Sequence, residues 1–488
     1  MRPMVEYCEL APDLKISRIL TGLWQIADME KDGIILEYEE TAKAMEPYYD
    51  AGLTSFDMAD HYGSAEIIAG TFRKKQLTVN PVQLLTKWVP KPGQKTKADV
   101  QSAVDLALER MQLDAIDLLQ FHTWDYADPN WLDCLFWLQE LKEEGFIKNI
   151  GLTNFNTAHL RIALTSGIDV VSNQVCYSLI DQRADGKMEK LCKEFDLKIL
   201  AFGTLAGGFL SEKWVDHAEP STGDLSTWSE MKYKRFIDVT GGWKKFQPLL
   251  RTLQEIAKKH AVSISNIATK YILDKPSVGG VIIGARLGKK DYIKENLKVF
   301  EIELDEADKK MIHEIQSQFD LVHGDCGDEY RKAPILTATG DLTHHLDVSA
   351  TPFTPIKMSG GRVRVNSGTV WEDFGGYSRA VRKGNQIAVS GTTASHGERL
   401  IGGSDPVAQA HFVIDKIQGV IESLGGHLED IVRTRVYVNN IKDWELVAQV
   451  HRERLGDIRP ANTLVEARLV GKEYLVEMEV DAIIDSTE

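Results

Sequence analysis

The stretches AIDLLQFH (115–122) and KILAFGTL (198–205) decide the fold, because each is a nearly continuous apolar run of strand length. Such runs are typical of strands buried on both faces of a parallel sheet. Comparable strand-like runs lie at 16–24, 55–59, 83–88, 116–122, 147–154, 170–178, 198–206 and 278–286. Helical patterns separate them, as in KADVQSAVDLALERMQL (97–113), where apolar residues recur every three or four positions. Repeated strand–helix units over this length predict a closed (β/α)8 TIM barrel, with an open doubly wound sheet as the alternative.

The composition is that of an ordinary soluble protein with an acidic balance. The 488-residue chain has 57 basic and 72 acidic side chains, a net charge of −15, which disfavours nucleic acid and anionic membranes as partners. No apolar run is long enough to predict a spanning helix, and residues 1–15 lack the apolar core of a signal peptide. The five cysteines are widely spaced without a CxxC pair, so we expect reduced thiols in a cytoplasmic protein.

The length predicts two or three domains, and the pattern changes near residue 320. We assign residues 1–325 to the barrel, 326–357 to a linker or a tail wrapping the barrel, and 358–488 to a second domain. Histidines at 323, 344 and 345 do not make a convincing metal site, because adjacent residues do not share a helix face. We therefore expect no metal.

The second domain reads as a small α+β unit. We expect strands at RVRVNSGTVW (362–371), NQIAVSGTT (385–393) and 430–440, helices at 405–426 and 443–456, and a closing strand pair at 462–469 and 474–484. Two helices on one face of a small sheet follow from this order.

In the first domain, a long connection at 207–245 carries Trp214, Trp228 and Trp243, which favours ordered packing over disorder.

Four polar residues of complementary type lie at or just after successive predicted strand ends: Asp57, Tyr62, Lys87 and His122. Each alone is explained by packing or by the surface, but the ends of barrel strands converge on one mouth. Reduction of a carbonyl by hydride needs a proton donor, for which Tyr62 is suited if the Lys87 ammonium lowers its pKa. Asp57 would hold Lys87, and His122 would orient the carbonyl oxygen. The set predicts a carbonyl reductase.

Residues 10–325 resemble the aldo-keto reductase family. The similar segments are FDMADHYG (56–63), IDLLQFHTWD (116–125), NIGLTNF (149–155), SNQVCYS (172–178) and VIIGAR (281–286) followed by ENL (295–297). The resemblance implies binding of NADP(H) at the barrel mouth without a Rossmann fold, and no GxGxxG follows a strand here. Met58 and Thr153 differ from the residues usual at their positions.

The resemblance also implies cofactor contacts. Thr153, Asn154 and Gln174 would hydrogen-bond the nicotinamide carboxamide, and Phe202 would stack on its ring. The pyrophosphate would lie along Gly203, Thr204 and Leu205, the 2′-phosphate against Arg286, and the adenine against Glu295 and Asn296. Further contacts are expected from Gly22, Leu23, Trp24, Asp57, Gly207 and Lys290.

One position departs from the family pattern at the phosphate end. Tyr292 stands where Arg or Gln is common, so that Lys289 or Lys290 would supply the charge. Because charge-assisted phosphate contacts remain available, NADP(H) is favoured over NAD(H). Candidates for the substrate pocket are Trp24, Tyr62, His122, Trp124, Tyr126 and the aromatic loop 211–245.

Residues 360–486 resemble the Rid family, also called YjgF, a chorismate-mutase-like fold. The similar segments are GGYSRAV (375–381), IAVSGTT (387–393), RPANTLVEARL (459–469) and YLVEMEV (474–480). Active members hydrolyse 2-imino acids at clefts between trimer subunits with an Arg in a PAR motif, whereas Asn462 stands there in this chain. Tyr377, Ser390 and Glu477 match other cleft positions. An amide cannot supply a bidentate charged contact, so we expect a module for trimerisation or ligand binding.

Together these patterns predict an NADPH-dependent aldo-keto reductase that interconverts a carbonyl and an alcohol, assembled as a homotrimer through its C-terminal domain. Two alternatives remain. One is a bifunctional protein whose Rid-like domain acts on an imine or enamine, against which Asn462 weighs. The other is a nucleotide-binding redox sensor without turnover, which the four polar residues at the predicted mouth disfavour.

Overall fold

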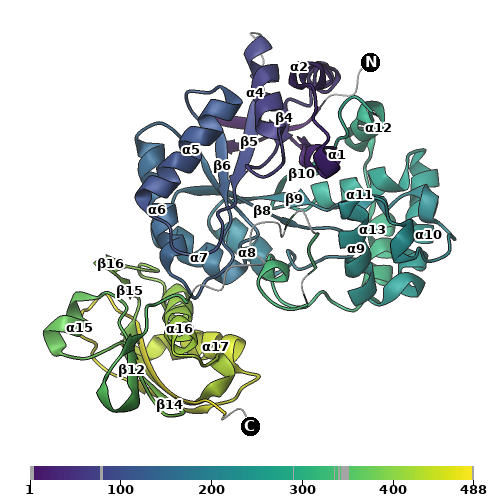
Figure 1. Ribbon diagram of the computed structural model, residues 1–488. Coiled ribbons are helices and arrows are strands. Elements are labelled where there is room, and N and C mark those ends of the chain that lie inside the picture. The colour runs from purple at the N-terminus through teal and green to yellow at the C-terminus, as the bar shows by residue number, and fades with distance from the viewer. Residues whose placement is uncertain are drawn as a thin grey trace.

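The computed structural model describes residues 5–76, 81–289, 291–334, 336–338, 341 and 351–485. Parallel strands form a closed barrel in the order β10–β3–β4–β5–β6–β7–β8–β9 (Figure 1). The strands are β3 (Ile19–Gly22), β4 (Ser55–Asp57), β5 (Gln83–Trp88), β6 (Leu118–Phe121), β7 (Ile150–Thr153), β8 (Val170–Cys176), β9 (Lys198–Phe202) and β10 (Val278–Gly284). The barrel prediction is confirmed, and the doubly wound sheet is excluded.

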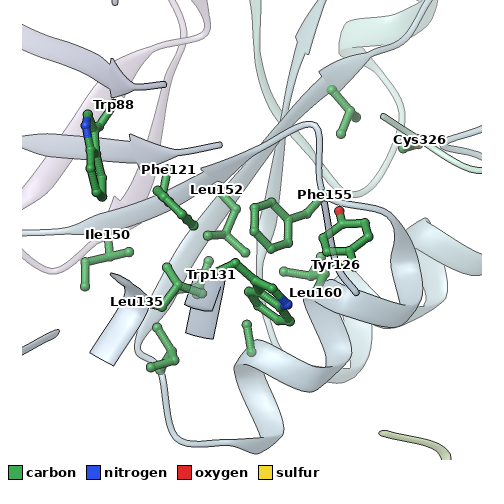
Figure 2. Close-up of a cluster of buried hydrophobic side chains, with 14 of the residues drawn as sticks. Trp88, Phe121, Tyr126, Trp131, Leu135, Ile150, Leu152, Phe155, Leu160 and Cys326 are labelled. Carbon is green, nitrogen blue, oxygen red and sulfur yellow. The ribbon is translucent and has the colours of Figure 1, made fainter. Parts of the chain in front are cut away.

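The barrel strands are largely buried because both of their faces are covered. Every residue of β5 and β6 is buried. Helices surround the strands: α1 (Trp24–Met29), α2 (Tyr38–Lys43), α3 (Glu46–Asp50), α4 (Ala65–Lys75), α5 (Lys97–Met111), α6 (Asn130–Glu143), α7 (Thr157–Thr165), α8 (Lys187–Glu194), α11 (Ile264–Leu273), α12 (Ile293–Leu297) and α13 (Glu306–Gln316). Figure 2 shows part of the layer between strands and helices, where Phe155 packs on Trp131 and where Phe121 and Leu152 belong to the same buried cluster.

A hairpin of β1 (Tyr7–Ala11) and β2 (Leu14–Ser17) closes the end of the barrel where the strands begin. Its Leu10, Leu14 and Ile16 pack on barrel residues such as Leu85 and Leu200. The opposite end, where the strands finish, therefore forms the open mouth.

The long connection at 207–245 is folded. It contains short helical turns, then α9 (Trp228–Val239), and leads into α10 (Gly242–His260). Trp214 and Trp243 are buried with their ring centroids 5.7 Å apart in an edge-to-face contact. The ring centroid of Trp228 lies 5.9 Å from that of Trp24 at the barrel mouth. The prediction of ordered packing is confirmed.

The C-terminal domain is a mixed sheet in the order β11–β12–β13–β14–β19–β17–β18, with α16 and α17 packed on one face. Its elements are β11 (Ile356–Lys357), β12 (Arg362–Val365), α15 (Val370–Gly375), β13 (Ala380–Lys383), β14 (Gln386–Thr393), α16 (Pro406–Ser423), β17 (Ile431–Val438), α17 (Trp444–Leu455), β18 (Ala461–Glu466) and β19 (Val476–Ile483). A short hairpin of β15 (Ser395–His396) and β16 (Arg399–Leu400) follows β14. The α+β architecture is confirmed.

Two details of this domain were predicted wrongly. The run 362–371 is a strand only to Val365, because Glu372 accepts bonds from the backbone N–H groups of Ser367 and Gly368 and a helix begins at Val370. The strands at 461–466 and 476–483 do not pair with each other: β19 lies between β14 and β17, and β18 is an edge strand parallel to β17.

The two domains contact each other through α16. In Figure 1 the small domain lies beside α6, α7 and α8 of the barrel. Asp415 of α16 lies 2.8 Å from His159 of α7, and Asp405 at the start of α16 lies 2.6 Å from Arg161. Among the described residues, none of the helices has the combination of length and apolar character that a membrane crossing needs.

Candidate active site

The strand ends open into a cavity of about 980 Å³. Asp57 ends β4, Lys87 lies near the end of β5, and His122 directly follows β6. Tyr62 comes from the loop after β4, and all four side chains line the cavity. The structure therefore brings together the four residues that the sequence placed at separate strand ends.

A buried ion pair forms the floor of the cavity. Lys87 Nζ donates to Oδ2 of Asp57 at 2.6 Å and to the carbonyl of Met58 at 2.9 Å. The other oxygen of Asp57 accepts from Gln174 at 2.7 Å and from Gln120 at 3.1 Å. Both atoms of this carboxylate are thus fixed, which sets the position of the ammonium 5.1 Å from the Tyr62 ring centroid.

The electrostatics keep Tyr62 protonated. Burial raises its pKa well above the ordinary value, and the charges of Asp57 and Asp341 add to this effect. Lys232 is the cation that lowers it, although not enough to reverse the shift. Burial also lowers the pKa of Lys87, against the opposing pull of Asp57. Burial therefore outweighs the lowering of the Tyr62 pKa that a nearby lysine ammonium provides, and the side chain is held as the phenol.

His122 forms one wall of the cavity with two aromatic residues. Its Nδ1 lies 3.2 Å from the carbonyl oxygen of Thr153, which fixes the orientation of the ring. Trp124 packs edge-on at 4.2 Å between ring centroids, and Tyr330 at 5.5 Å. His122 is 1% exposed, so a carbonyl oxygen beside it would lie away from bulk water.

Residues expected to contact the nicotinamide end form a continuous side of the cavity. It is lined by Gly22, Trp24, Thr153, Asn154, Gln174, Phe202, Gly203, Thr204, Leu205 and Gly207. Asn154 adopts a left-handed φ of 58°, and within the described residues its buried Oδ1 has no hydrogen-bond partner. Such an orphaned acceptor fits a carboxamide N–H. At Gly203, an added Cβ would lie 2.3 Å from the Tyr233 hydroxyl oxygen, so only glycine fits.

The far end of the cavity holds the residues expected at the adenosine phosphate. Arg286, Lys289, Glu295 and Asn296 line it, as does Tyr292. Arg286 Nη2 lies 3.6 Å from Oδ2 of Asp28, a carboxylate that is 2% exposed. The donors of this end fit a dinucleotide, but a buried acid already faces the guanidinium that would hold a phosphate. Leu23 is fully buried instead of lining the cavity, and Lys290 lies outside the described residues.

Part of the substrate end carries no signal in the sequence. Lys232 on α9 is 6% exposed and donates to the Tyr330 hydroxyl at 2.8 Å and to Asp341 at 2.9 Å. All three line the cavity, and Lys232 Nζ lies 5.3 Å from the Phe202 ring centroid. No strand end carries these residues, so the signal that revealed Asp57 and His122 is absent for them. Residues 330 and 341 also lie in the predicted linker.

Of the aromatic candidates for the substrate pocket, Trp24 and Trp124 line the cavity. Tyr126 is instead 8% exposed and buried between neighbours: its ring stacks on His159, with centroids 3.4 Å apart and planes inclined by 4°. The long loop contributes Ser211, Lys213, Thr227, Ser229, Glu230, Lys232 and Tyr233 to the lining.

The Rid-like residues fall in two places on the C-terminal sheet. Ser390 and Glu477 lie on neighbouring strands β14 and β19, and Tyr377 precedes β13, where its hydroxyl accepts from Arg379. Asn462 lies on edge strand β18 and accepts from Thr434 on β17. Within one chain, Asn462 therefore does not join the other three residues.

Within the part of the chain that the structure describes, no group of three or more His, Cys, Asp or Glu side chains is arranged to hold a metal ion. His323 is exposed. His344 and His345 lie outside the described residues.

Comparison with known proteins gives two family matches. The family described as Aldo/keto reductase matches residues 18–317, and Endoribonuclease L-PSP matches 371–484. The NADH-specific methylglyoxal reductase of Escherichia coli K12 is 23% identical over 62% of this chain and 95% of its own.

Two solved structures are also similar. A thermostable aldo-keto reductase in complex with epalrestat is 25% identical, with a TM-score of 0.50 over 64% of this chain and 99% of that chain. A Mycobacterium tuberculosis member of the YjgF/YER057c/UK114 family is 40% identical, covering 25% of this chain and 99% of that chain, with a TM-score of 0.23.

Proposed function

The chain belongs to the aldo/keto reductase family and carries a C-terminal YjgF-type domain, and from that premise we propose that it is an NADPH-dependent reductase of aldehydes or ketones. The single observation that carries this proposal is the arrangement of Tyr62, His122 and the Asp57–Lys87 pair around one cavity. Bound NAD(P)H supplies the hydride.

Protein side chains orient the carbonyl group and supply the proton. His122 donates to the carbonyl oxygen of the substrate and orients it. Tyr62 delivers the proton to the alkoxide oxygen as it forms, and its raised pKa keeps that proton on the phenol until charge develops. Asp57 and Lys87 hold a fixed positive charge beneath the Tyr62 ring, which stabilises the phenolate that proton transfer leaves behind.

We propose NADP(H) in preference to NAD(H) because Arg286 and Lys289 line the phosphate end of the cavity. Asp28 opposes this preference, and the Escherichia coli relative is named as NADH-specific, so the margin between the two cofactors is small. A reducing, cytoplasmic compartment is part of the proposal, since all five cysteines are free and four are buried.

For the C-terminal domain we propose self-association into a trimer. Its sheet leaves Val465 of β18 and Ile483 of β19 exposed, at 42% and 40%, on strands whose helices cover only one face. Sedimentation of residues 355–488 and of the full chain at micromolar concentration tests this. A trimer supports the assembly, and a monomer in both contradicts it.

Oxidation of NADPH and of NADH against a panel of aldehydes and ketones tests the reductase. We expect turnover with at least one carbonyl and a lower KM for NADPH. Tight nucleotide binding with no turnover across the panel would favour the alternative of a redox-sensing module. Hydrolysis of imines would favour the bifunctional alternative.

A further inference from the structure

A buried contact joins the two domains through α7, the helix that begins just after Asn154 on the cofactor side of the cavity. His159 on α7 and Asp415 on α16 are 4% and 1% exposed, and His159 Nε2 lies 2.8 Å from Asp415 Oδ2. Burial alone would raise the pKa of Asp415, but Arg454, 2.7 Å away, and His159 bring it to about 2. Asp415 therefore presents a permanent negative charge to the barrel.

From His159 a column of stacked groups runs towards the mouth. The His159 ring covers one face of Tyr126 at 3.4 Å, and the guanidinium of Arg331 lies 4.2 Å from the Tyr126 centroid. Because His159 occupies one face of the tyrosine, Arg331 lies against the other. The Tyr126 hydroxyl also accepts from the backbone N–H of Asn156 at 3.3 Å. Figure 2 shows Tyr126 beside Phe155 at the edge of the buried cluster.

The column ends on the backbone of the cofactor side. Arg331 donates to the carbonyl of Asn154 at 2.7 Å and to that of Thr123 at 2.6 Å. Gly327 packs so closely on the same Asn154 carbonyl that an added Cβ would lie 1.9 Å from it. Thr123 follows His122, and Asn154 follows Thr153. Arg331 thus holds the two loops that carry the proposed carbonyl and carboxamide contacts.

We propose that the C-terminal domain positions the nicotinamide end of the cavity through the column Asp415–His159–Tyr126–Arg331. Asp415 and Arg331 are positioning residues in this account, since neither lines the cavity. The proposal rests on the proposed role of Asn154 as a carboxamide ligand. It also explains why Tyr126, expected at the substrate, is buried in this column instead.

The physical reason for the coupling is the conformation of Asn154. Its left-handed φ of 58° is uncommon outside glycine, although asparagine adopts it more readily than most residues, and neighbouring contacts hold it here. Those contacts are the bond from its own N–H to Gln174 O at 2.8 Å and the clamp on its carbonyl by Arg331 and Gly327. Loosening the clamp should let the Asn154 side chain turn away from its present direction, in which Oδ1 meets no hydrogen-bond partner among the described residues.

The chain offers a matched control for the domain contact. Asp405 also bridges the domains, through Arg161 at 2.6 Å, but it lies at the start of α16, ten residues before Asp415. Its Oδ1 accepts from the backbone N–H groups of Val407 and Ala408, a capping role that asparagine fills equally well. Asp405→Asn therefore removes an interdomain ion pair and leaves the helix start and the column intact.

Calorimetry on the full chain with NADPH and with 2′-AMP, which lacks nicotinamide, tests the column. In Asp415→Asn and Arg331→Met the Kd for NADPH should rise about threefold to tenfold while that for 2′-AMP stays unchanged. Asp405→Asn should alter neither Kd, and Arg331→Lys should recover part of the loss. Equal effects of Asp415→Asn and Asp405→Asn on NADPH, or a parallel loss of 2′-AMP binding, would overturn the proposal.

Hydrogen exchange separates this inference from the proposed function. Backbone amides of 154–157 in the protein without nucleotide should exchange faster in Asp415→Asn than in wild type or Asp405→Asn. If wild type bound neither NADPH nor NADH, the proposed function would fail, and the exchange rates would still decide whether the column holds the loop. Unchanged exchange in Asp415→Asn contradicts the column.

Discussion

Lys87 and Asp57 form a buried ion pair 2.6 Å long at the floor of the barrel mouth, with side chains that are 5% and 4% exposed. Two glutamines, Gln120 and Gln174, occupy the other carboxylate oxygen. Because every polar atom of Asp57 is held, the pair has little freedom to rearrange. Its position relative to Tyr62 is therefore a fixed property of the fold.

Replacing Lys87 should damage both stability and activity. Lys87→Met leaves Asp57 as a buried carboxylate without its cation, and we expect a loss of about 3–5 kcal/mol in the free energy of unfolding. The carbonyl reduction rate should fall at least about 100-fold, since the charge beneath Tyr62 is lost. Urea unfolding and steady-state kinetics measure the two effects. Lys97→Met, which breaks an exposed pair with Glu140, serves as the control and should leave both unchanged. Wild-type activity in Lys87→Met would remove the lysine from the mechanism.

The raised pKa of Tyr62 predicts different pH dependences for the two reaction directions, flat for carbonyl reduction and rising with pH for alcohol oxidation. Reduction uses the protonated phenol, which persists to well above pH 10, so its rate should show no loss attributable to Tyr62 between pH 6 and 9. Alcohol oxidation needs the phenolate, whose fraction rises about tenfold per pH unit below the pKa. Initial rates of carbonyl reduction and of alcohol oxidation, measured from pH 6 to 9, test these two pH dependences. A reduction rate that falls with an apparent pKa near 8 contradicts the assignment.

Sequence patterns were sufficient for the barrel and the four polar residues of its mouth, because strand ends of a barrel must converge. They were insufficient wherever a contact joins distant segments. Lys232 and Tyr330 meet at 2.8 Å only because a helix and the segment after the barrel fold over the same mouth. The sequence around Tyr126 does not indicate that His159 and Arg331 pack against its ring. The prediction of a strand pair at 462–484 was wrong for the same reason, since β19 pairs with β14 and β17 instead of with β18.

Asp28 should determine how strongly NADP(H) is preferred over NAD(H). Its carboxylate faces Arg286 at 3.6 Å and would repel a phosphate bound to that guanidinium. Asp28→Asn should lower the Kd for NADPH and for 2′-AMP about threefold to tenfold, the scale of a charge interaction near a protein surface. Affinity for NADH and 5′-AMP, measured in the same variant, supplies the control and should not change. An equal change in Kd for NADPH and NADH would show that Asp28 acts on the fold instead of on the phosphate.

The C-terminal domain should lack imine hydrolysis. Asn462 cannot give the bidentate contact that a carboxylate takes from arginine, and its amide oxygen is already engaged with Thr434. Full-length protein incubated with freshly generated 2-imino acids should match the rate in buffer, with an active Rid-family deaminase as the positive control. Hydrolysis above buffer that disappears in Glu477→Gln would reverse this account of the domain.

The most direct test of the central claim is hydride transfer in a single turnover with Tyr62→Phe. This variant removes only the hydroxyl and retains the ring that packs on Trp24 at 5.0 Å. We expect NADPH to bind with unchanged affinity while its oxidation by a carbonyl substrate slows by about 100-fold or more, the usual scale for losing a general acid. Oxidation at the wild-type rate would contradict the assignment of Tyr62 as the proton donor and with it the proposed reductase mechanism.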